Sequence, residues 1–343
     1  MWKLFVAQHG SDPFLLSFSR RQKIRICESF CDSLRYGNLG GQSKVAKKAG
    51  TIRNIISQIG QVFQQNEIHS PFLDQNRALT FSIAKLLKSY ENEDPSRDCQ
   101  PALPLCFFEK VLDLLHSSYT QGNDYNISLC QLTCIASFFG LRSVEYTLTR
   151  DKNPKTKRLT VDNVTFKFKT LPHMSPYIRQ NADFVLFTFE NQKNGIRNQT
   201  ITRPKASSQC IPGYCPVQIA GALVDRIRGY KYTDKNPPIN LMMCNGKPHL
   251  ITYEEMIKFQ KGVATGIGKA KIGFAPSKIG THSMRVTFAT NLFNQGYSDA
   301  IIMAEGRWES NAFLKYIRLN YSDPQYNVTE AIASSRNRSI ILN

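Results

Sequence analysis

The segment from Gly280 to Arg318 concentrates side chains that can act together on a phosphate ester. His282 and Arg285 are three residues apart, so on a helix they share one face. Trp308 and Tyr316 follow within the same segment. A guanidinium binds phosphate oxygens, an imidazole takes up a proton, and a phenol becomes a nucleophile once it is deprotonated. This combination predicts cleavage of a phosphate ester by a tyrosine, whereas Trp308 or Tyr316 taken alone would be interpreted as a core residue.

Three short helices are expected to carry these side chains. With Thr281 or Ser283 as its cap, the first helix would offer free backbone N–H groups and a positive dipole end, which suit a phosphate. Ser298 and Ser310 are expected to cap the second and third helices. The first helix has apolar residues at helical spacing, which predict its buried face: Met284, Phe288, Ala289, Leu292 and Phe293.

A second candidate site residue lies much earlier in the chain. The stretch from Ser128 to Phe139 is apolar nearly all round, which predicts a buried helix that ends at Gly140. Arg142 follows at once, three residues before Glu145. An arginine on such rigid support can aim its planar fork at phosphate oxygens, with Glu145 orienting the neighbouring groups. The alternative for Arg142 and Glu145 is a surface ion pair.

The order of these residues resembles the tyrosine recombinase (phage-integrase type) family. That family has a first arginine, then His-x-x-Arg, then Gly-(His/Trp), then a nucleophilic tyrosine about nine residues later. Here Arg307 stands between Gly306 and Trp308, and Tyr316 follows Trp308 by eight residues. Gly-Arg-Trp with the ending Phe-Leu-x-Tyr-Ile-Arg is more similar to recombinases of eukaryotic mobile elements of the crypton or DIRS type.

The resemblance implies a mainly α fold with a small β-sheet (α+β), in which a helical core-binding domain precedes the tyrosine-recombinase catalytic domain. It also implies strand cleavage and rejoining through a 3′-phosphotyrosine, without metal, ATP or another cofactor. A predicted hairpin follows the extended run Phe184–Phe189, and on it Lys193 matches the family's general acid, with Lys169 and Lys205 as rivals. The implied catalytic set is Arg142, Lys193, His282, Arg285, Trp308 and Tyr316.

Composition favours a polyanionic partner. The chain has 343 residues, a formal net charge of +18 and an isoelectric point near 9.5. Such a charge favours nucleic acid, with a ribosomal-type RNA binder or a membrane-surface protein as alternatives. The resemblance implies that the partner is double-stranded DNA. The sequence lacks an apolar run of membrane-spanning length, so no membrane association is expected. Nine cysteines without metal-site spacing indicate free thiols in a reducing compartment, which is the nucleus if the host is eukaryotic.

The first part of the chain combines apolar helical faces with an excess of basic residues. We expect a helical, DNA-clamping domain over residues 1–95, a linker at 96–104 and the catalytic domain with a C-terminal tail over 105–343. The stretch Tyr90–Pro104, rich in proline and charge, is predicted to be exposed. In the family that the chain resembles, such a tail often docks on a neighbouring subunit, so the resemblance implies a dimer or tetramer assembled on DNA. The residues expected to contact DNA, rather than form a merely solvated face, are Arg20, Arg21, Lys23, Arg25, Lys44, Lys47, Lys48, Arg53 and Lys278.

Two other functions remain open at this point. A type IB topoisomerase-like enzyme would use the same chemistry to relax one duplex instead of exchanging strands between two. A DNA-binding protein descended from a recombinase would keep the basic surface and no longer cut. The complete set of polar groups argues against a protein that no longer cuts. The resemblance implies a site-specific recombinase or integrase of a mobile element.

Overall fold

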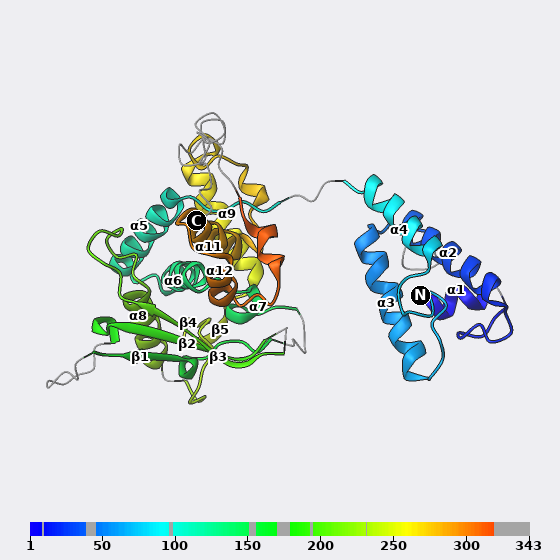
Figure 1. Cartoon of the computed structure of the whole chain (residues 1–343). Helices are drawn as coiled ribbons and strands as arrows, with labels where there is room; N and C mark the ends of the chain where they lie inside the picture. Colours follow the sequence, from blue (N-terminus) through cyan, green and yellow to red (C-terminus); the bar gives the residue numbers. More distant parts are fainter. Residues whose placement is uncertain are drawn as a thin grey trace, which may run out of the picture. The chain divides into compact units, whose positions relative to one another are not determined.

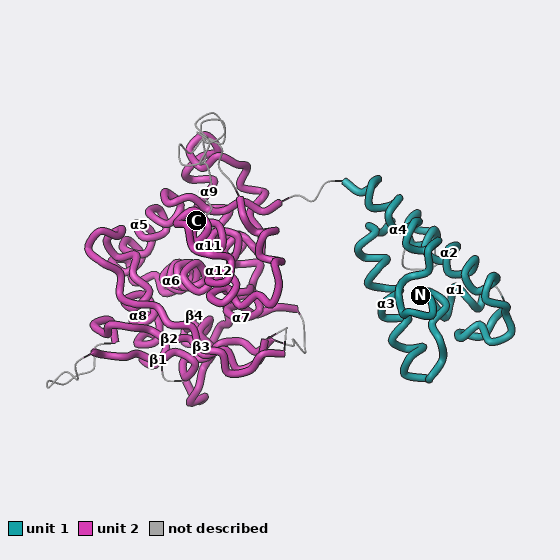
Figure 2. Tube along the Cα trace, in the orientation of Figure 1, with its two compact units in different colours: residues 1–97 teal, residues 98–343 magenta. Residues whose placement is uncertain are grey.

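The computed structural model describes residues 1–8, 10–38, 46–95, 99–150, 156–169, 179–192, 195–230 and 232–318. The chain divides into two compact units, Met1–Arg97 and Asp98–Asn343 (Figure 2). Helices dominate both units, and two small antiparallel sheets lie in the second, so the predicted α+β class is confirmed (Figure 1). In the described part of the chain, no helix is long and apolar enough to cross a membrane.

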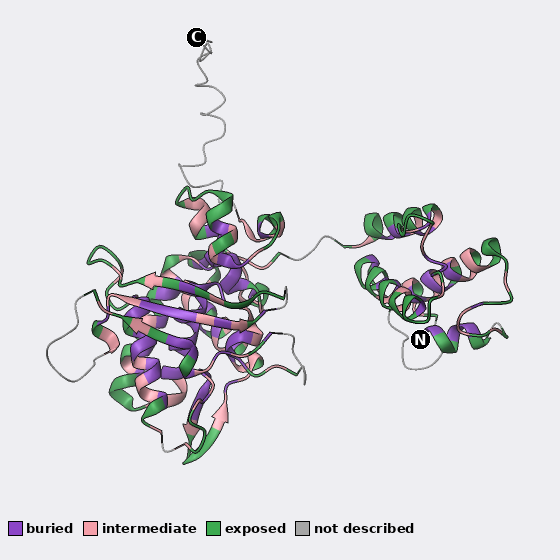
Figure 3. Cartoon of the chain, turned by 60° about the horizontal axis from the view of Figure 1, so that its bottom comes forward, coloured by how far each residue is buried: buried purple, intermediate pink, exposed green. Residues whose placement is uncertain are grey.

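The described residues of the first unit form four helices: α1 (Trp2–Gln8), α2 (Arg20–Tyr36), α3 (Ala49–Gln65) and α4 (Phe81–Glu93). The N–H of Ser19 donates to Gln22 Oε1 over 2.9 Å, which satisfies a backbone group at the start of α2. Aromatic rings fill the space between the helices. The ring of Trp2 lies 5.1 Å from that of Phe30 and 5.5 Å from that of Phe72, centroid to centroid. Burial is thus concentrated on the inward faces of the helices (Figure 3).

The stretch predicted to be exposed from Tyr90 onwards is buried at both ends. Tyr90 is 2% exposed because its ring packs in the apolar core of the first unit, where its phenol donates to Asp32. Leu103 is also 2% exposed, and its N–H donates to Thr287 Oγ1 over 2.8 Å in the second unit. The stretch is polar on average, but its individual apolar side chains are buried in the cores of the two units.

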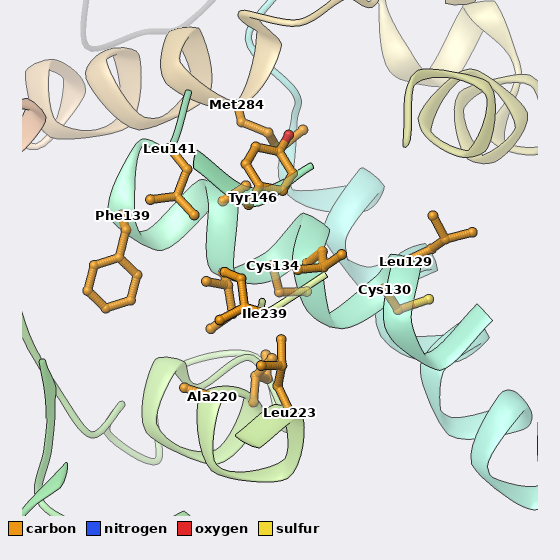
Figure 4. Close-up of a cluster of buried hydrophobic side chains, with 14 of the residues drawn as sticks. Leu129, Cys130, Cys134, Phe139, Leu141, Tyr146, Ala220, Leu223, Ile239 and Met284 are labelled. Atoms are coloured by element: carbon orange, nitrogen blue, oxygen red, sulfur yellow. The ribbon is translucent and has the colours of Figure 1, made fainter. Parts of the chain in front are cut away.

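A buried helix organises the second unit. The predicted helix at Ser128–Phe139 is confirmed and begins earlier, as α6 (Asp124–Phe139), because the side chain of Asn123 accepts the N–H of Asn126. Figure 4 shows Cys134 of α6 above Ala220 and Leu223 of α8 (Pro216–Arg228). The other helices of this unit are α5 (Leu105–Gln121), α7 (Ser143–Tyr146), α8 (Pro216–Arg228), α9 (Tyr253–Ile267), α10 (Lys269–Ile272), α11 (Ser283–Asn294) and α12 (Asp299–Gly306).

The larger sheet has the order β1-β2-β3. Its strands are β1 (Val164–Lys167), β2 (Phe184–Asn191) and β3 (Arg197–Pro204), with Phe187 opposite Ile201 in the antiparallel register. The extended run predicted at Phe184–Phe189 is confirmed and forms most of β2. A second hairpin of β4 (Leu241–Cys244) and β5 (Lys247–Leu250) was not predicted, although Asn245 and Gly246, with φ of 50° and 74°, are its turn signal.

We expect Trp2→Ala to lower the free energy of unfolding of the first unit by about 3–5 kcal/mol, because it leaves a cavity between several rings. Leu4→Ala is the matched control on the same helix, since Leu4 is 68% exposed. Hydrogen exchange of peptides from residues 1–95 in the full-length chain measures both changes. Equal protection in the two variants would show that Trp2 does not hold this core together.

Candidate active site

Helix α11 carries Arg285 into the interior of the second unit. The prediction that Thr281 or Ser283 caps this helix is wrong: His282 occupies the cap position, and its side chain forms no cap hydrogen bond. The reason is that Ser283 Oγ accepts the N–H of Gly280 over 3.1 Å instead. The N–H of His282 donates to Gln100 Oε1 over 2.7 Å, which fixes the start of the helix. The side chain of His282 is exposed.

Arg285 is enclosed, with 2% of its surface exposed. Its Nη1 donates to the carbonyl of Gly140 over 2.7 Å, and its Nη2 donates to the carbonyl of Gly306 over 2.9 Å. Its Cζ lies 4.3 Å from the centroid of the Trp308 ring. Burial, followed by the neighbouring charges of Arg142 and Arg307, lowers the pKa of Arg285 to about 9. The guanidinium is thus held rigidly and remains charged at neutral pH.

Tyr316 lies against the same group. It ends a 3₁₀ helix, η4 (Asn311–Tyr316), which is the third of the expected short helices, and the residue is partly buried. Its ring centroid lies 5.5 Å from that of Trp308 and 5.9 Å from that of His282. The Cζ of Arg285 lies 6.0 Å from the Tyr316 ring. The four residues predicted within the segment 280–318 therefore gather in one place.

Two predicted caps position these residues. Ser298 Oγ accepts the N–H of Ile301 over 3.5 Å at the start of α12. Ser310 Oγ accepts the N–H of Ala312 over 3.4 Å at the start of η4. Both caps are confirmed, and η4 is anchored by the fully buried ring of Phe313.

Arg142 precedes the short helix α7 and contacts the same group of residues. Its Nη1 donates to Glu145 Oε1 over 2.9 Å, and its Nη2 donates to the carbonyl of Arg307 over 3.4 Å. The alternative of a surface ion pair is wrong, because the side chain of Glu145 is 0% exposed. The side chain of Arg142 is 20% exposed, so this guanidinium can meet an incoming ligand while its partner stays buried.

Arg307 is a residue of the site that the sequence revealed only as a departure from the family spacing. It is 2% exposed, and its Nη2 donates to Glu145 Oε2 over 2.8 Å. Its Nη1 donates to the carbonyl of Phe139 over 3.1 Å, and its Cζ lies 3.6 Å from the centroid of the Phe189 ring. Burial is the main reason that the pKa of Arg307 falls to about 10. No local pattern could reveal the pairing, because 162 residues separate it from Glu145.

The carboxylate of Glu145 is the centre of these contacts. Burial favours its neutral form, yet the charges of Arg307, Arg142 and Arg285 outweigh burial and lower its pKa. At neutral pH three guanidiniums therefore surround one carboxylate, and the group carries a net positive charge. Such an excess in a site that opens at Arg142 suits an anionic ligand.

The hairpin of β2 and β3 approaches the site at one end only. Lys193, predicted as general acid, lies outside the described residues. The residue before it, Gln192, is 3% exposed, and its Oε1 accepts Arg142 Nη1 over 3.4 Å. The rivals Lys169 and Lys205 both bond through their N–H groups to Asp183, beyond the far end of β2. That strand has eight residues, so roughly 25 Å separates the rivals from Gln192.

The predicted DNA-contacting residues of the first unit cluster on the starts of α2 and α3. Lys44 lies outside the described residues. The guanidinium of Arg53 forms an ion pair within the unit, because its Nη2 donates to Glu91 Oε1 over 2.8 Å. In the second unit Lys278 is exposed in a short 3₁₀ turn before α11. In the predicted set of the first unit, Arg20, Arg21, Arg25, Lys48 and Arg53 are exposed, and Lys23 and Lys47 are partly exposed.

Metal ligands do not gather at this site. Among the residues that the structure describes, no group of three or more His, Cys, Asp or Glu side chains is placed to hold a metal ion. Glu145, the carboxylate at the centre of the site, has both of its oxygens bonded to arginine.

No protein-family model and no curated protein matches the sequence. Similar solved structures include the integrase of the transposon Tn1549 in complex with circular-intermediate DNA, with 16% identity over 92% of this chain and 87% of that chain and a TM-score of 0.46. Another is the XerH site-specific recombinase bound to a palindromic difH substrate, with 15% identity, 95% and 75% coverage and a TM-score of 0.49. The XerA recombinase has 12% identity, 97% and 96% coverage and a TM-score of 0.39. These neighbours are integrases and recombinases, but with TM-scores this low the activity of the chain has to follow from its own side chains.

We expect Glu145→Gln to lower the free energy of unfolding at neutral pH by about 3–5 kcal/mol, because it leaves buried guanidiniums without their counter-charge. The folded pKa of Glu145 lies below its ordinary value of 4.5, so its contribution is complete above that pH and is lost as the pH falls through the folded pKa. The gap between wild type and variant should therefore narrow in acid. Urea unfolding over a pH series measures this gap.

The matched control is Glu305→Gln. Glu305 also pairs with an arginine, Arg203, but its side chain is 37% exposed. We expect this variant to lose no more than about 1 kcal/mol at neutral pH. Equal losses for the two variants, or a gap that does not change with pH, would contradict the central role given to the Glu145 carboxylate.

Proposed function

We propose that this chain is a site-specific DNA recombinase or integrase that cuts and rejoins DNA with Tyr316 as its nucleophile. One observation carries the proposal: the guanidiniums of Arg142 and Arg285, which come from distant parts of the sequence, meet beside Trp308 and the phenol. Arg285 contacts the ring of Trp308 and lies 6.0 Å from that of Tyr316. Arg142 bonds to the carbonyl that directly precedes Trp308.

The chemistry follows from the charges of this group. A phosphodiester carries one negative charge and gains a second as a phenolate attacks its phosphorus. Arg142 and Arg285 are placed to stabilise that added charge, and losing one such donor typically costs on the order of 10²–10³ in rate. The bond that forms joins Tyr316 Oη to phosphorus, and the bond that breaks releases the 5′ oxygen. The product is a 3′-phosphotyrosine, and its reversal by a 5′ hydroxyl rejoins DNA without ATP.

His282 and Trp308 serve the same phosphate in different ways. The phenol attacks phosphorus only after it has lost its proton, so the reaction needs a proton acceptor. His282 is the candidate acceptor, because its ring centroid is 5.9 Å from that of Tyr316. Trp308 cannot titrate; it covers Arg285 and can donate only through its indole N–H. Protonation of the 5′ oxygen is assigned to Lys193, whose preceding residue bonds to Arg142.

Double-stranded DNA is the proposed substrate, and the first unit adds a basic surface for its backbone. Strand exchange between two duplexes requires more than one active site, so we propose a homo-oligomer on DNA. The Gly-Arg-Trp segment supports a mobile element of eukaryotic type as the source of the chain, with the nucleus as its place of action. A direct test of that source is the DNA that flanks the gene, where terminal or split repeats are expected.

A suicide substrate that is nicked next to the cleavage position tests the nucleophile. We expect wild-type protein to trap a covalent DNA adduct that Tyr316→Phe abolishes completely, because the variant retains the ring contacts and lacks the attacking oxygen. Tyr297→Phe, which changes a phenol that is 48% exposed in the same unit, should form as much adduct as wild type. Denaturing electrophoresis shows the adduct.

The other outcomes separate the competing functions. An adduct that persists in Tyr316→Phe would move the nucleophile to another tyrosine. No adduct from wild type on any duplex would favour a DNA-binding protein that no longer cuts. Adduct formation with relaxation of one supercoiled plasmid, and without exchange between two, would favour the type IB topoisomerase alternative.

The basic surface on α2 gives a separate prediction for DNA binding. Replacing Arg20, Arg21, Lys23 and Arg25 by Gln should reduce the slope of log affinity against log salt by roughly 0.9 for each lost phosphate contact. The control replaces Lys85 and Lys88, exposed lysines on α4 outside the predicted set. Fluorescence anisotropy with duplex DNA over a salt series measures the slopes. An unchanged slope for the α2 variant would remove this surface from the interface.

A further inference from the structure

Arg307 connects the backbone before Trp308 to the buried carboxylate under the site. Its φ is 59°, a left-handed conformation that non-glycine residues adopt rarely and at an energetic cost. The turn folds Trp308 back over Gly306, where an added Cβ would lie 1.6 Å from the indole ring. The strain of this turn is offset by the contacts of the Arg307 side chain with Glu145 and the carbonyl of Phe139.

The same residue holds Arg142 in two ways. Its main-chain carbonyl accepts Arg142 Nη2 over 3.4 Å. Its Nη2 donates to Glu145 Oε2 over 2.8 Å. Glu145 Oε1 is then available to accept Arg142 Nη1 over 2.9 Å. Arg142 thus has a fixed partner on each side while its side chain stays 20% exposed toward a ligand.

Counting charges shows what Arg307 adds. Arg142 and Arg285 with Glu145 alone would carry a net charge of one, because the carboxylate cancels one guanidinium. Arg307 pairs with that carboxylate and raises the net charge of the group to plus two. A phosphodiester under attack by a phenolate carries two negative charges, so the group with Arg307 matches the transition state.

We infer that Arg307 is a positioning residue for phosphodiester cleavage: it neutralises Glu145 so that the full charge of Arg142 acts on the scissile phosphate. The inference rests on the proposed function of this site. The Arg307 guanidinium lies on the ring of Phe189 and binds Glu145 and the carbonyl of Phe139, whereas Arg285 lies beside the ring of Tyr316. Arg307 therefore acts through Glu145 and Arg142. Arg307, the residue that stands between Gly306 and Trp308, thus has the role of positioning Arg142.

The test compares two suicide substrates, one with the natural phosphodiester and one with a methylphosphonate at the scissile position. The methylphosphonate carries one negative charge fewer, so it has less need for the charge that Arg307 releases. We expect Arg307→Met to slow adduct formation on the order of 10²-fold with the phosphodiester and less than about tenfold with the methylphosphonate. Rates of each variant are divided by the wild-type rate on the same substrate.

Two further variants separate charge from packing. Arg203→Met removes a neighbouring arginine whose side chain is 16% exposed and which pairs with Glu305 instead; its effect should be the same on both substrates. The double variant Glu145→Gln with Arg307→Met restores the net charge of two, and it should react about tenfold faster with the phosphodiester than Arg307→Met alone. Thermal unfolding of every variant shows whether the chain is folded at the assay temperature.

Each result decides between the proposals. Equal losses on both substrates in folded Arg307→Met, or a double variant no faster than the single one, would overturn the role of Arg307 and leave the proposed function intact. Should Arg307→Met not fold, Arg307→Lys replaces it: retained charge predicts equal ratios on both substrates, and a loss confined to the phosphodiester would overturn the inference. Wild-type protein that forms no adduct with either substrate would overturn the proposed function and this inference with it.

Discussion

The second unit depends on one buried carboxylate that holds several guanidiniums together. Arginines brought this close in a low-dielectric interior would repel one another without Glu145 between them. Its Oε1 accepts Arg142 Nη1 and its Oε2 accepts Arg307 Nη2, while the carbonyl of Phe139 accepts Arg307 Nη1. The positive charge of the group exceeds its negative charge. An anion completes that balance, which is why the arrangement favours binding of a phosphate over a purely structural role.

The rigidity of this group comes from the hydrophobic core below it. Gly140 ends the buried helix α6 with φ of 52°, and a Cβ there would lie 2.8 Å from the ring of Phe288 on α11. Its carbonyl accepts Arg285 Nη1 over 2.7 Å. The same glycine thus allows close packing of α6 against α11 and supplies a hydrogen bond to the site. Precision in the polar group follows from the packing of apolar helices, since rotation of α11 would break both contacts.

What the sequence could and could not predict follows from the range of the interactions involved. Helical spacing and serine caps are local, and they located α6, α12 and η4 to within a few residues. The gathering of Arg142 with the segment 280–318 followed from the order of a family motif and from no local signal. The pairing of Glu145 with Arg307 left no signal at all, because two single residues far apart in sequence have no periodicity. The cap at His282 was missed because Ser283 bonds back to Gly280, a choice decided by tertiary structure.

The central claim is that a single phosphate is bound between the phenol of Tyr316 and the guanidiniums held by Glu145. A structure of the protein with a nicked DNA duplex and orthovanadate tests it most directly, because vanadate adopts the geometry of a phosphorus atom under attack. The account predicts vanadium bonded to Tyr316 Oη, with Arg142 and Arg285 nitrogens within about 3 Å of its equatorial oxygens. Vanadium bonded to another residue, or bound out of reach of both guanidiniums, would contradict it.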